Sequence, residues 1–408
     1  MKLLLLTPYL PHPLAGHAAG EYPYHLIEHL APRHEITLVS FCDEREMTLA
    51  PDLGRLPIRV HTIPRTKGKQ GTFAANAALA LVRLLQLLRS VLLWQPYYVS
   101  KFFDRRMARL VRDLTAGESF DCVLVEFTFM ASYRSSIRKG ATTVLQEIDV
   151  SIRPAYRRLK NASSLGTRLV AYVEWCRWMR YEVGAVRSFD HVLTVTDQDR
   201  MLLKKLTGVG HISYFAHAFD VPPRIVPAQD REKHTLLFLG SYAHSPNRDS
   251  ALWLCQSIFP LVRRQYPDAK LFIAGPHAPS ELLEAARKEP GVEVLGFVEN
   301  LDAYLERCAV FAAPLRFGGG IKNKVLYAMA RGLPVVATGI GVEGIDGLET
   351  KPALLAPTPE KFAEQIGRLF DDTALAAELS ARGVELVRAH YSWENSVRQL
   401  ESILASRR

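Results

Sequence analysis

Short apolar runs that alternate with segments of helical pattern constrain the fold of this chain more than any other feature. Each run has the length of a buried strand, and a segment long enough for a helix separates most successive runs. This alternation is typical of βαβ units, whose strands lie parallel and whose helices cover the sheet. The sequence therefore predicts an α/β protein built on parallel sheets.

The predicted elements are as follows. Strands are expected at Leu3–Leu6, Ile36–Ser40, Ile58–Ile63, Cys122–Glu126, Thr142–Leu145, His191–Val195, Leu236–Gly240, Lys270–Ala274, Val292–Leu295, Val310–Ala313 and Pro334–Ala337. Helices are expected near Gly20–Leu30, Phe73–Leu93, Phe102–Ala116, Arg168–Arg187, Gln198–Leu206, Arg248–Gln265, Ser280–Lys288, Leu301–Arg307, Lys322–Arg331, Pro359–Phe370 and Leu375–Ala389, with a last one after Ser392.

A polar, proline-bearing stretch at 219–234 divides this series of elements. A chain of 408 residues is too long for one ordinary domain. We therefore expect two doubly wound, Rossmann-like domains, at 1–218 and 235–389, joined by this linker. Such folds bind ligands at the carboxyl ends of their strands, so the cleft between the domains is the expected site.

Charge and cysteine content narrow the classes of function. The net charge of +9 suits phosphorylated ligands or an acidic membrane surface. Because no nucleic-acid-reading motif accompanies it, we expect no nucleic-acid partner. The five cysteines are odd in number, far apart and without a C-x-x-C pair, which argues against disulfides or a zinc site and favours a reducing, cytoplasmic compartment.

Two apolar stretches invite a membrane interpretation. The run Leu3–Leu6 is too short for the core of a signal peptide, and reads better as a buried strand. The stretch 73–99 is interrupted by Arg83, Arg89 and Pro96, whereas a bilayer crossing needs about 20 nearly uncharged residues. For residues 73–107 two interpretations stay open: a basic, aromatic surface resting on the inner face of a membrane, or a buried helix of the first domain.

The most informative segment is a glycine-rich loop, Phe317–Lys324, between a strand and a helix. Gly318, Gly319 and Gly320 let backbone N–H groups approach a ligand closely. The helix that follows adds the positive end of its dipole, and Lys322 and Lys324 add full charges. This arrangement predicts a diphosphate cradle; the alternative is a flexible loop with two solvated lysines.

Loops after neighbouring strands of the second half are expected to complete the pocket. Gly240 and Ser241 follow one predicted strand, Gly275 follows the next, and Glu343 follows a later one as a possible hydroxyl acceptor. Taken singly, each is better explained as a turn than as a ligand contact. Their common position at strand ends predicts a shared donor site.

The first half offers a second set of candidates. Gly16 and His17 lie in the loop after the first strand, and His217 is a further candidate. Three acids follow later strands: Glu126, Glu147 and Asp149. Acids in such places suit binding of an acceptor hydroxyl or, for Asp149, proton handling. The alternative is that they cap helices or pair with Arg153, Arg157 and Arg158.

The second half resembles the retaining glycosyltransferases of the GT-B fold, in particular their family 4. The similarity is carried by these segments in order: Phe238-Leu-Gly-Ser with Pro246-Asn247, Ile273-Ala-Gly, Val294-Leu-Gly-Phe-Val, Pro314-Leu-Arg316 with the three glycines and Lys324-Val-Leu, and Gly332-Leu-Pro-Val-Val-Ala-Thr with Gly341-Val-Glu-Gly-Ile. The first half matches more loosely.

The resemblance implies a first domain for an acceptor, a second for a nucleoside-diphosphate sugar, and a final helix (390–408) that packs back on the first. It implies that Lys324 holds the diphosphate, with Lys322, Arg316 and Gly318–Gly320 beside it. Tyr327 stands where this branch usually has a glutamate for the ribose hydroxyls. A phenol cannot make the bidentate contact of a carboxylate, so Glu343 is a candidate substitute.

The leading hypothesis is therefore a retaining, metal-independent glycosyltransferase, with a UDP- or GDP-linked sugar as co-substrate and no other cofactor. Its acceptor is a glycan, a lipid-linked glycan or a small molecule, and polysaccharide or glycoconjugate synthesis is the expected pathway. A second hypothesis, motivated by Tyr327, is a weak or inactive relative that binds nucleotide sugars or acts as a scaffold. A third, an NAD-dependent oxidoreductase, is disfavoured because no G-x-G-x-x-G fingerprint is present.

Overall fold

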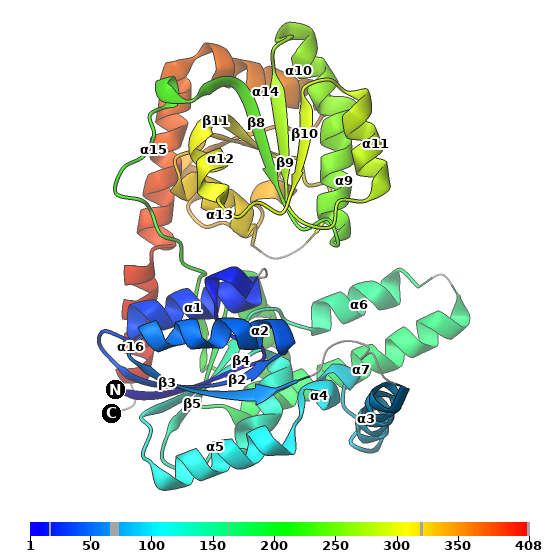
Figure 1. Ribbon diagram of the computed structural model, residues 1–408, viewed down its shortest axis with the longest axis vertical. Coiled ribbons are helices and arrows are strands. Elements are labelled where there is room, and N and C mark those ends of the chain that lie inside the picture. Colours follow the sequence, from blue (N-terminus) through cyan, green and yellow to red (C-terminus); the bar gives the residue numbers. More distant parts are fainter. Residues whose placement is uncertain (16–17, 66–72, 163, 319–320, 406–408) are drawn as a thin grey trace. The chain divides into compact units, whose positions relative to one another are not determined.

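The computed structural model describes residues 1–15, 18–65, 73–162, 164–318 and 321–405. Two compact units are present, one made of Met1–Phe215 and Val397–Arg408, the other of Ala216–Ser396. Each unit is a parallel sheet covered by helices, which confirms the predicted α/β class (Figure 1).

The sheet of the first unit has the strand order β3-β2-β1-β4-β5-β6-β7, and all its pairs are parallel. Its strands are β1 (Lys2–Thr7), β2 (Glu35–Cys42), β3 (Ile58–Pro64), β4 (Cys122–Glu126), β5 (Thr142–Glu147), β6 (His191–Thr194) and β7 (Ile212–Tyr214). The apolar start of the sequence is thus a central strand, buried from Leu3 to Thr7. Only β7 escapes prediction, because a three-residue strand carries no recognisable pattern.

The helices of the first unit follow the predicted ones with three exceptions. They are α1 (Ala18–Leu30), α2 (Glu44–Leu49), α3 (Phe73–Leu92), α4 (Tyr97–Phe102), α5 (Arg105–Gly117), α6 (Ile152–Lys160), α7 (Leu165–Ser188) and α8 (Asp197–Thr207). Helices α2, α4 and α6 are additional. The predicted helix Phe102–Ala116 is shorter, because Asp104 caps α5 by accepting a hydrogen bond from the Arg106 N–H at 2.7 Å.

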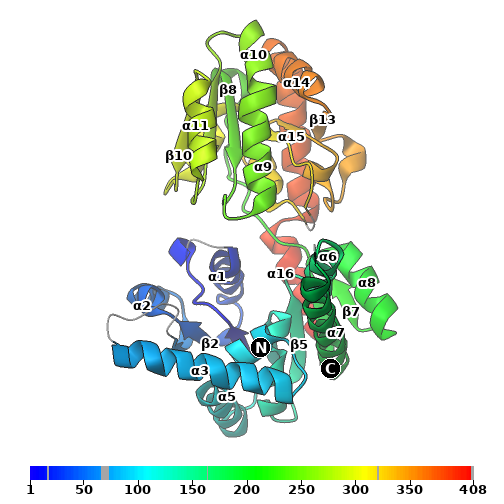
Figure 2. The ribbon, with the colours of Figure 1, turned by 90° about the vertical axis from the view of Figure 1, so that its right-hand side faces the viewer.

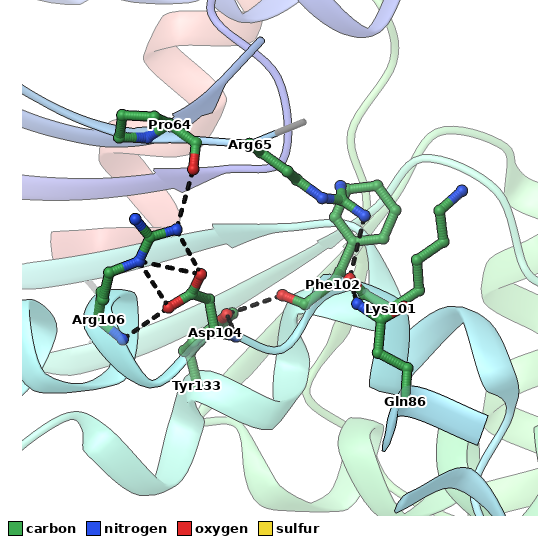
Figure 3. A network of polar contacts seen from close by, with 8 residues as sticks. All are labelled: Pro64, Arg65, Gln86, Lys101, Phe102, Asp104, Arg106 and Tyr133. Carbon is green, nitrogen blue, oxygen red and sulfur yellow. Dashed lines mark hydrogen bonds and ion pairs between the residues drawn. The ribbon is translucent and has the colours of Figure 1, made fainter. Parts of the chain in front are cut away.

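A network of polar contacts fixes the junction of α4 and α5 (Figure 3). The Tyr133 hydroxyl accepts from the Asp104 N–H and donates to the Phe102 carbonyl, both at 2.7 Å. The Arg65 guanidinium donates to the Lys101 carbonyl at 3.0 Å and lies 3.8 Å from the centroid of the Phe102 ring. The end of β3 and the short helix α4 are thereby held together.

The sheet of the second unit has the order β10-β9-β8-β11-β12-β13, again with parallel pairs. Its strands are β8 (Glu232–Leu239), β9 (Lys270–Ala274), β10 (Val292–Gly296), β11 (Cys308–Ala313), β12 (Val335–Ala337) and β13 (Ala353–Leu355), of which only β13 escapes prediction. Its helices are α9 (Ser245–Trp253), α10 (Phe259–Gln265), α11 (Ser280–Lys288), α12 (Leu301–Arg307), α13 (Asn323–Ala330), α14 (Pro359–Asp371) and α15 (Thr373–His390).

The predicted helix Arg248–Gln265 is divided between α9 and α10. A π-helical turn, Leu254–Ile258, joins the two, and Pro260 follows it. Proline has no N–H to donate, so the regular i→i−4 ladder cannot continue through it. The apolar pattern runs unbroken through this turn, which is why it predicts one helix.

The segment predicted as a linker, 219–234, belongs to the second unit, and β8 begins within it at Glu232. Arg231 is buried, and its guanidinium donates to the carbonyls of Leu305, Cys308 and Arg331 at 2.6–3.1 Å. Arg231, a polar residue of this segment, therefore supplies hydrogen bonds to backbone carbonyls of the second unit.

The last helix, α16 (Trp393–Ala405), extends into the residues that belong to the first unit. Glu401 accepts hydrogen bonds from Arg33 at 3.2 Å and from the His34 ring at 2.8 Å, just beyond α1. Gln399 donates to the Tyr214 carbonyl of β7 at 2.5 Å. The C-terminal segment therefore completes the first unit.

In both sheets the chain reverses direction of winding beside a central strand. β1 has β2 on one side and β4 on the other, and β8 has β9 on one side and β11 on the other. Loops that leave the two sides of such a switch point diverge and leave room for a ligand at the carboxyl ends of the strands. The loops after β8 and β11 are therefore where a site is expected in the second unit.

Candidate functional site

Lys324 lies at the switch point of the second unit. From the first turn of α13 its Nζ donates to the Leu239 carbonyl, at the end of β8, at 2.9 Å. It also donates to the Asn247 Oδ1 at 2.6 Å and lies 4.5 Å from the centroid of the Phe238 ring. The structure thus brings the most strongly predicted residue to the carboxyl end of the central strand.

The surroundings of Lys324 disfavour its charge. Burial, with a smaller contribution from the charge of Lys322, lowers the pKa of Lys324 to about 7. Its two acceptors are neutral, and among the described residues no carboxylate forms an ion pair with it. An anion placed at this amine would stabilise its protonated form, so the position suits a phosphate group.

The loops after β8 and β9 are packed against each other and against α9. A Cβ at Gly275, whose φ is +134°, would lie 2.0 Å from the Gly240 carbonyl oxygen. A Cβ at Gly240 would lie 2.6 Å from the Asn247 side chain, which itself donates to the Ser241 carbonyl at 2.9 Å. The small residues Gly240 and Gly275 thus allow the close approach of the loops that position Asn247 and Lys324.

The described part of the glycine-rich loop is tied to α9. Gly318 has a φ of +136°, and a Cβ there would lie 3.7 Å from Pro246. Arg316 donates through Nε to Asp249 at 2.9 Å and lies 5.1 Å from the centroid of the Trp253 ring. Gly319 and Gly320 lie outside the described residues, so their predicted role stays a prediction.

Lys322 and Glu343 approach each other beside Lys324. Lys322 is buried at the N-cap of α13, and its Nζ lies 4.0 Å from the Glu343 carboxylate, which is exposed. Glu343 ends the 3₁₀ turn Ile340–Val342 that follows β12. The structure therefore places Lys322, Lys324 and Glu343 around one end of α13.

Tyr327 is engaged one turn further along α13. Its hydroxyl donates to Asp302 of α12 at 2.8 Å. Arg331 binds the same carboxylate at 2.9 and 3.0 Å, and its guanidinium lies 4.8 Å from the Tyr327 ring centroid. No pattern in the sequence links Asp302 to Tyr327 or Arg331, so the partner of Tyr327 could not be predicted.

His217 lies at the other side of the start of α13. Its Nδ1 is 2.9 Å from the Asn323 side-chain nitrogen, and burial lowers the pKa of His217 to about 4. The imidazole is therefore neutral at physiological pH. A neutral ring bonded to the helix start holds Asn323 in place without adding charge.

The first unit contains a buried acidic pair. The Thr128 hydroxyl contacts the Glu147 carboxylate and the Glu182 carboxylate, the latter at 3.0 Å. Glu182 also accepts from the N–H groups of Ser151 and Ile152 at 2.8 and 2.9 Å. Burial raises the pKa of Glu182 to about 7, and burial together with the nearby Glu182 charge raises that of Glu147 well above its usual range.

Glu126, at the end of β4, is also fully buried, and burial raises its pKa to about 8. Neither carboxyl oxygen has a hydrogen-bond partner in the part of the chain that the structure describes. Asp149 is exposed, whereas Gly16 and His17 lie outside the described residues. Arg153, one of the predicted alternative partners of these acids, pairs with Asp199 at 3.1 Å.

No group of three or more His, Cys, Asp or Glu side chains among the described residues could hold a metal ion. No described helix has both the length and the apolar character that crossing a membrane demands. All five cysteines lie in the described part of the chain, where none of them forms a disulfide, and four of them are buried.

Comparisons with known proteins agree with the fold. Residues 233–372 match the family of glycosyl transferases group 1. A GDP-mannose-dependent monoacylated alpha-(1-6)-phosphatidylinositol monomannoside mannosyltransferase of Corynebacterium glutamicum is 31% identical over 170 residues, 36% of this chain and 42% of that protein. An uncharacterised 44.6 kDa protein in the cps region of Klebsiella pneumoniae is 22% identical over 290 residues, 69% of this chain and 73% of that protein.

Among solved structures, HepE from Anabaena in complex with UDP and glucose superposes with a TM-score of 0.64 at 15% identity, over 100% of both chains. At this identity the likeness shows the fold. The family match covers the part of the second unit that contains Lys324 and stops short of the first unit.

Proposed function

We propose that this chain is a retaining glycosyltransferase of family 4 that transfers a sugar from a UDP- or GDP-sugar to an acceptor hydroxyl without a metal ion. The observation that carries the proposal is the amine of Lys324, held at the end of β8 by neutral groups and with its pKa lowered to about 7. Such an amine gains most from a ligand that brings negative charge.

The chemistry follows from where charge develops. The acceptor oxygen bonds to the anomeric carbon as the bond from that carbon to the diphosphate breaks, and the electron pair leaves on the phosphate oxygen. The hydroxyl proton passes to that same oxygen on the same face of the sugar. Lys324, Lys322 and the N-terminus of α13 stabilise the departing diphosphate, so a strong protein base is not required.

Incubation with UDP- and GDP-sugars and a panel of glycan, lipid-linked and small-molecule acceptors tests the proposal. We expect a product whose anomeric configuration, read by NMR coupling constants, equals that of the donor. Inverted product would contradict the retaining mechanism. Binding without transfer or hydrolysis would instead favour the alternative of a nucleotide-sugar-binding or scaffolding protein. The hydrogen bond from Tyr327 to Asp302 is the reason for considering that alternative.

Nucleotide binding should depend on pH through Lys324. Its pKa is about 7 in the free protein and rises when a diphosphate binds, so protonated lysine is the form that binds. Affinity for UDP or GDP should therefore fall above pH 7, by up to about tenfold per pH unit. Calorimetric titration across this range checks the slope, and Lys324→Gln should remove it; an unchanged slope in that variant would contradict the assignment.

We further propose that the first unit rests on the cytoplasmic face of a membrane through residues 73–107. The second half of α3 and the turn after it expose Leu81, Leu84, Leu85, Leu88, Val91, Leu92, Leu93 and Trp94, each by 45% or more. A buried helix, the alternative for this stretch, would not leave so many leucines in water. Arg83 is exposed in the same half of α3, and Lys101 belongs to the next helix, α4; basic residues near apolar ones suit an anionic lipid surface.

A further inference from the structure

Helices α6 and α7 form a hairpin that projects from the sheet of the first unit (Figure 1). The buried side chains of α7 are Trp178, Glu182, Ala185 and Val186, all in its C-terminal half. Its N-terminal half packs on α6 and reaches beyond the core. The hairpin is therefore anchored at one end and exposed at the other.

The exposed end of this hairpin is apolar. Leu165, Leu169 and Val170 are 87%, 64% and 71% exposed, and Tyr156 and Tyr172 beside them are about half exposed. We call these five residues the hairpin surface. Single exposed leucines are common, but a cluster on a projecting element marks a surface that another body covers.

The charges of the hairpin indicate what covers the hairpin surface. Exposed basic residues surround the hairpin surface, namely Arg157, Arg158, Lys160 and Arg168. Glu174 is the single acidic residue of the sequence between Ile152 and Arg180. Two copies of so basic a hairpin would repel each other, whereas an anionic lipid surface would attract it.

An open groove of about 510 Å³ between the two helices strengthens this argument. Ala155, Val170 and Ala171 supply apolar lining, Arg158 and Thr167 supply a cation and a hydroxyl, and the carboxylate of Glu174 lines the groove as well. A groove of this kind matches the two ends of a phospholipid, an acyl chain and a phosphate.

The hairpin is continuous with the exposed end of α3. Arg180 of α7 donates to the carbonyls of Leu93 and Trp94 at 3.4 and 3.3 Å. The Arg177 guanidinium lies 4.8 Å from the Trp94 ring centroid. Figure 2 shows α3 running close to the lower part of α7. The apolar end of α3 and the hairpin thus belong to one side of the first unit.

We propose that the hairpin surface is a second membrane-binding element, which inserts its apolar residues among anionic phospholipids while its arginines and lysine contact their phosphates. The inference rests on the proposed membrane contact of α3, and it names anionic phospholipids as the lipids that the first unit contacts. Two separate elements on one side would also fix the orientation of the first unit on the bilayer, which a single helix cannot do.

Sedimentation of the full chain with vesicles tests the proposal, with phosphatidylcholine alone and with phosphatidylglycerol added. We expect binding to the anionic vesicles, weakened by salt, and a loss of roughly tenfold or more for Leu165→Asp/Leu169→Asp. Met201→Asp, at a residue of α8 that is 58% exposed, is the matched control and should bind like wild type. Leu84→Asp/Leu88→Asp tests α3 on its own.

The outcomes separate the proposals. If the hairpin variant binds anionic vesicles as well as wild type, or if wild type does not bind them, the hairpin proposal is overturned. If wild type is a dimer and the hairpin variant a monomer with unchanged vesicle binding, the hairpin is a self-association surface instead. UDP and GDP binding, measured on every variant, should not change; its absence from wild type would reject the donor site and leave the vesicle result standing.

Discussion

Lys324→Ala is expected to lower kcat/KM for sugar transfer by about 10²–10³-fold, the effect of removing one preorganised charge from a transition state. The reason is local: the amine lies at the carboxyl end of β8, bonded to Leu239 and Asn247, where the departing diphosphate gains negative charge. Nucleotide affinity and transfer rate, measured with the same donor, separate the loss of binding from the loss of turnover.

The control for this variant is Lys361→Ala. Lys361 is an exposed lysine of the same unit that pairs with Glu364 at 2.5 Å on α14. It should leave both affinity and rate unchanged. Thermal unfolding of both variants is needed, because Lys324→Ala also removes a donor from two acceptors; equal activity of a folded Lys324→Ala protein would reject the proposed site.

Gly275→Ala is expected to destabilise the second unit by about 3 kcal/mol or more, the range of a backbone clash added to a strained φ. A Cβ there would lie 2.0 Å from the Gly240 carbonyl oxygen, and neither loop can move without displacing Asn247. We expect a lower midpoint in chemical unfolding of the second unit and weaker nucleotide binding in what remains folded.

Gly296→Ala provides the comparison that isolates the clash. Gly296 ends the neighbouring strand β10, has a φ of +70°, and a Cβ there would have nothing within 4 Å. Its cost should be that of the left-handed backbone alone, about 1–2 kcal/mol. Equal destabilisation by the two substitutions would mean that the contact between the loops after β8 and β9 is not tight.

The fold of this chain is largely readable from its sequence, because buried parallel strands are apolar runs bounded by polar turns. Eleven predicted strands correspond to strands of the two sheets, from β1 to β12 with β7 omitted. Most of what escapes prediction is short: β7, β13, α2 and α4 are too brief for periodicity to show, and the nine-residue α6 escapes as well. The division of α9 from α10 escapes for another reason, since a π-helical turn keeps the apolar face continuous.

The candidate site is only partly readable. The order strand, glycine loop, lysine pair makes Lys322 and Lys324 recognisable in the sequence. The small residues after β8 and β9 make those two loops recognisable as well. Asn247, which accepts a hydrogen bond from Lys324, and Asp302, which binds Tyr327, act across distances in the sequence that no local pattern encodes. Glu182 is harder still to predict from the sequence, because it lies within the long helix α7 and shares the Thr128 hydroxyl with Glu147.

The discontinuity of the first unit has a consequence for the order in which the protein is made. All of its strands leave the ribosome before residue 216, but the segment from Val397 that completes it is synthesised after the whole of the second unit. The hydrogen bonds from Arg33 and His34 to Glu401 are therefore among the last to form. During synthesis the first unit is therefore incomplete, and Arg33 and His34 lack their partner Glu401 until the segment that begins at Val397 has been made.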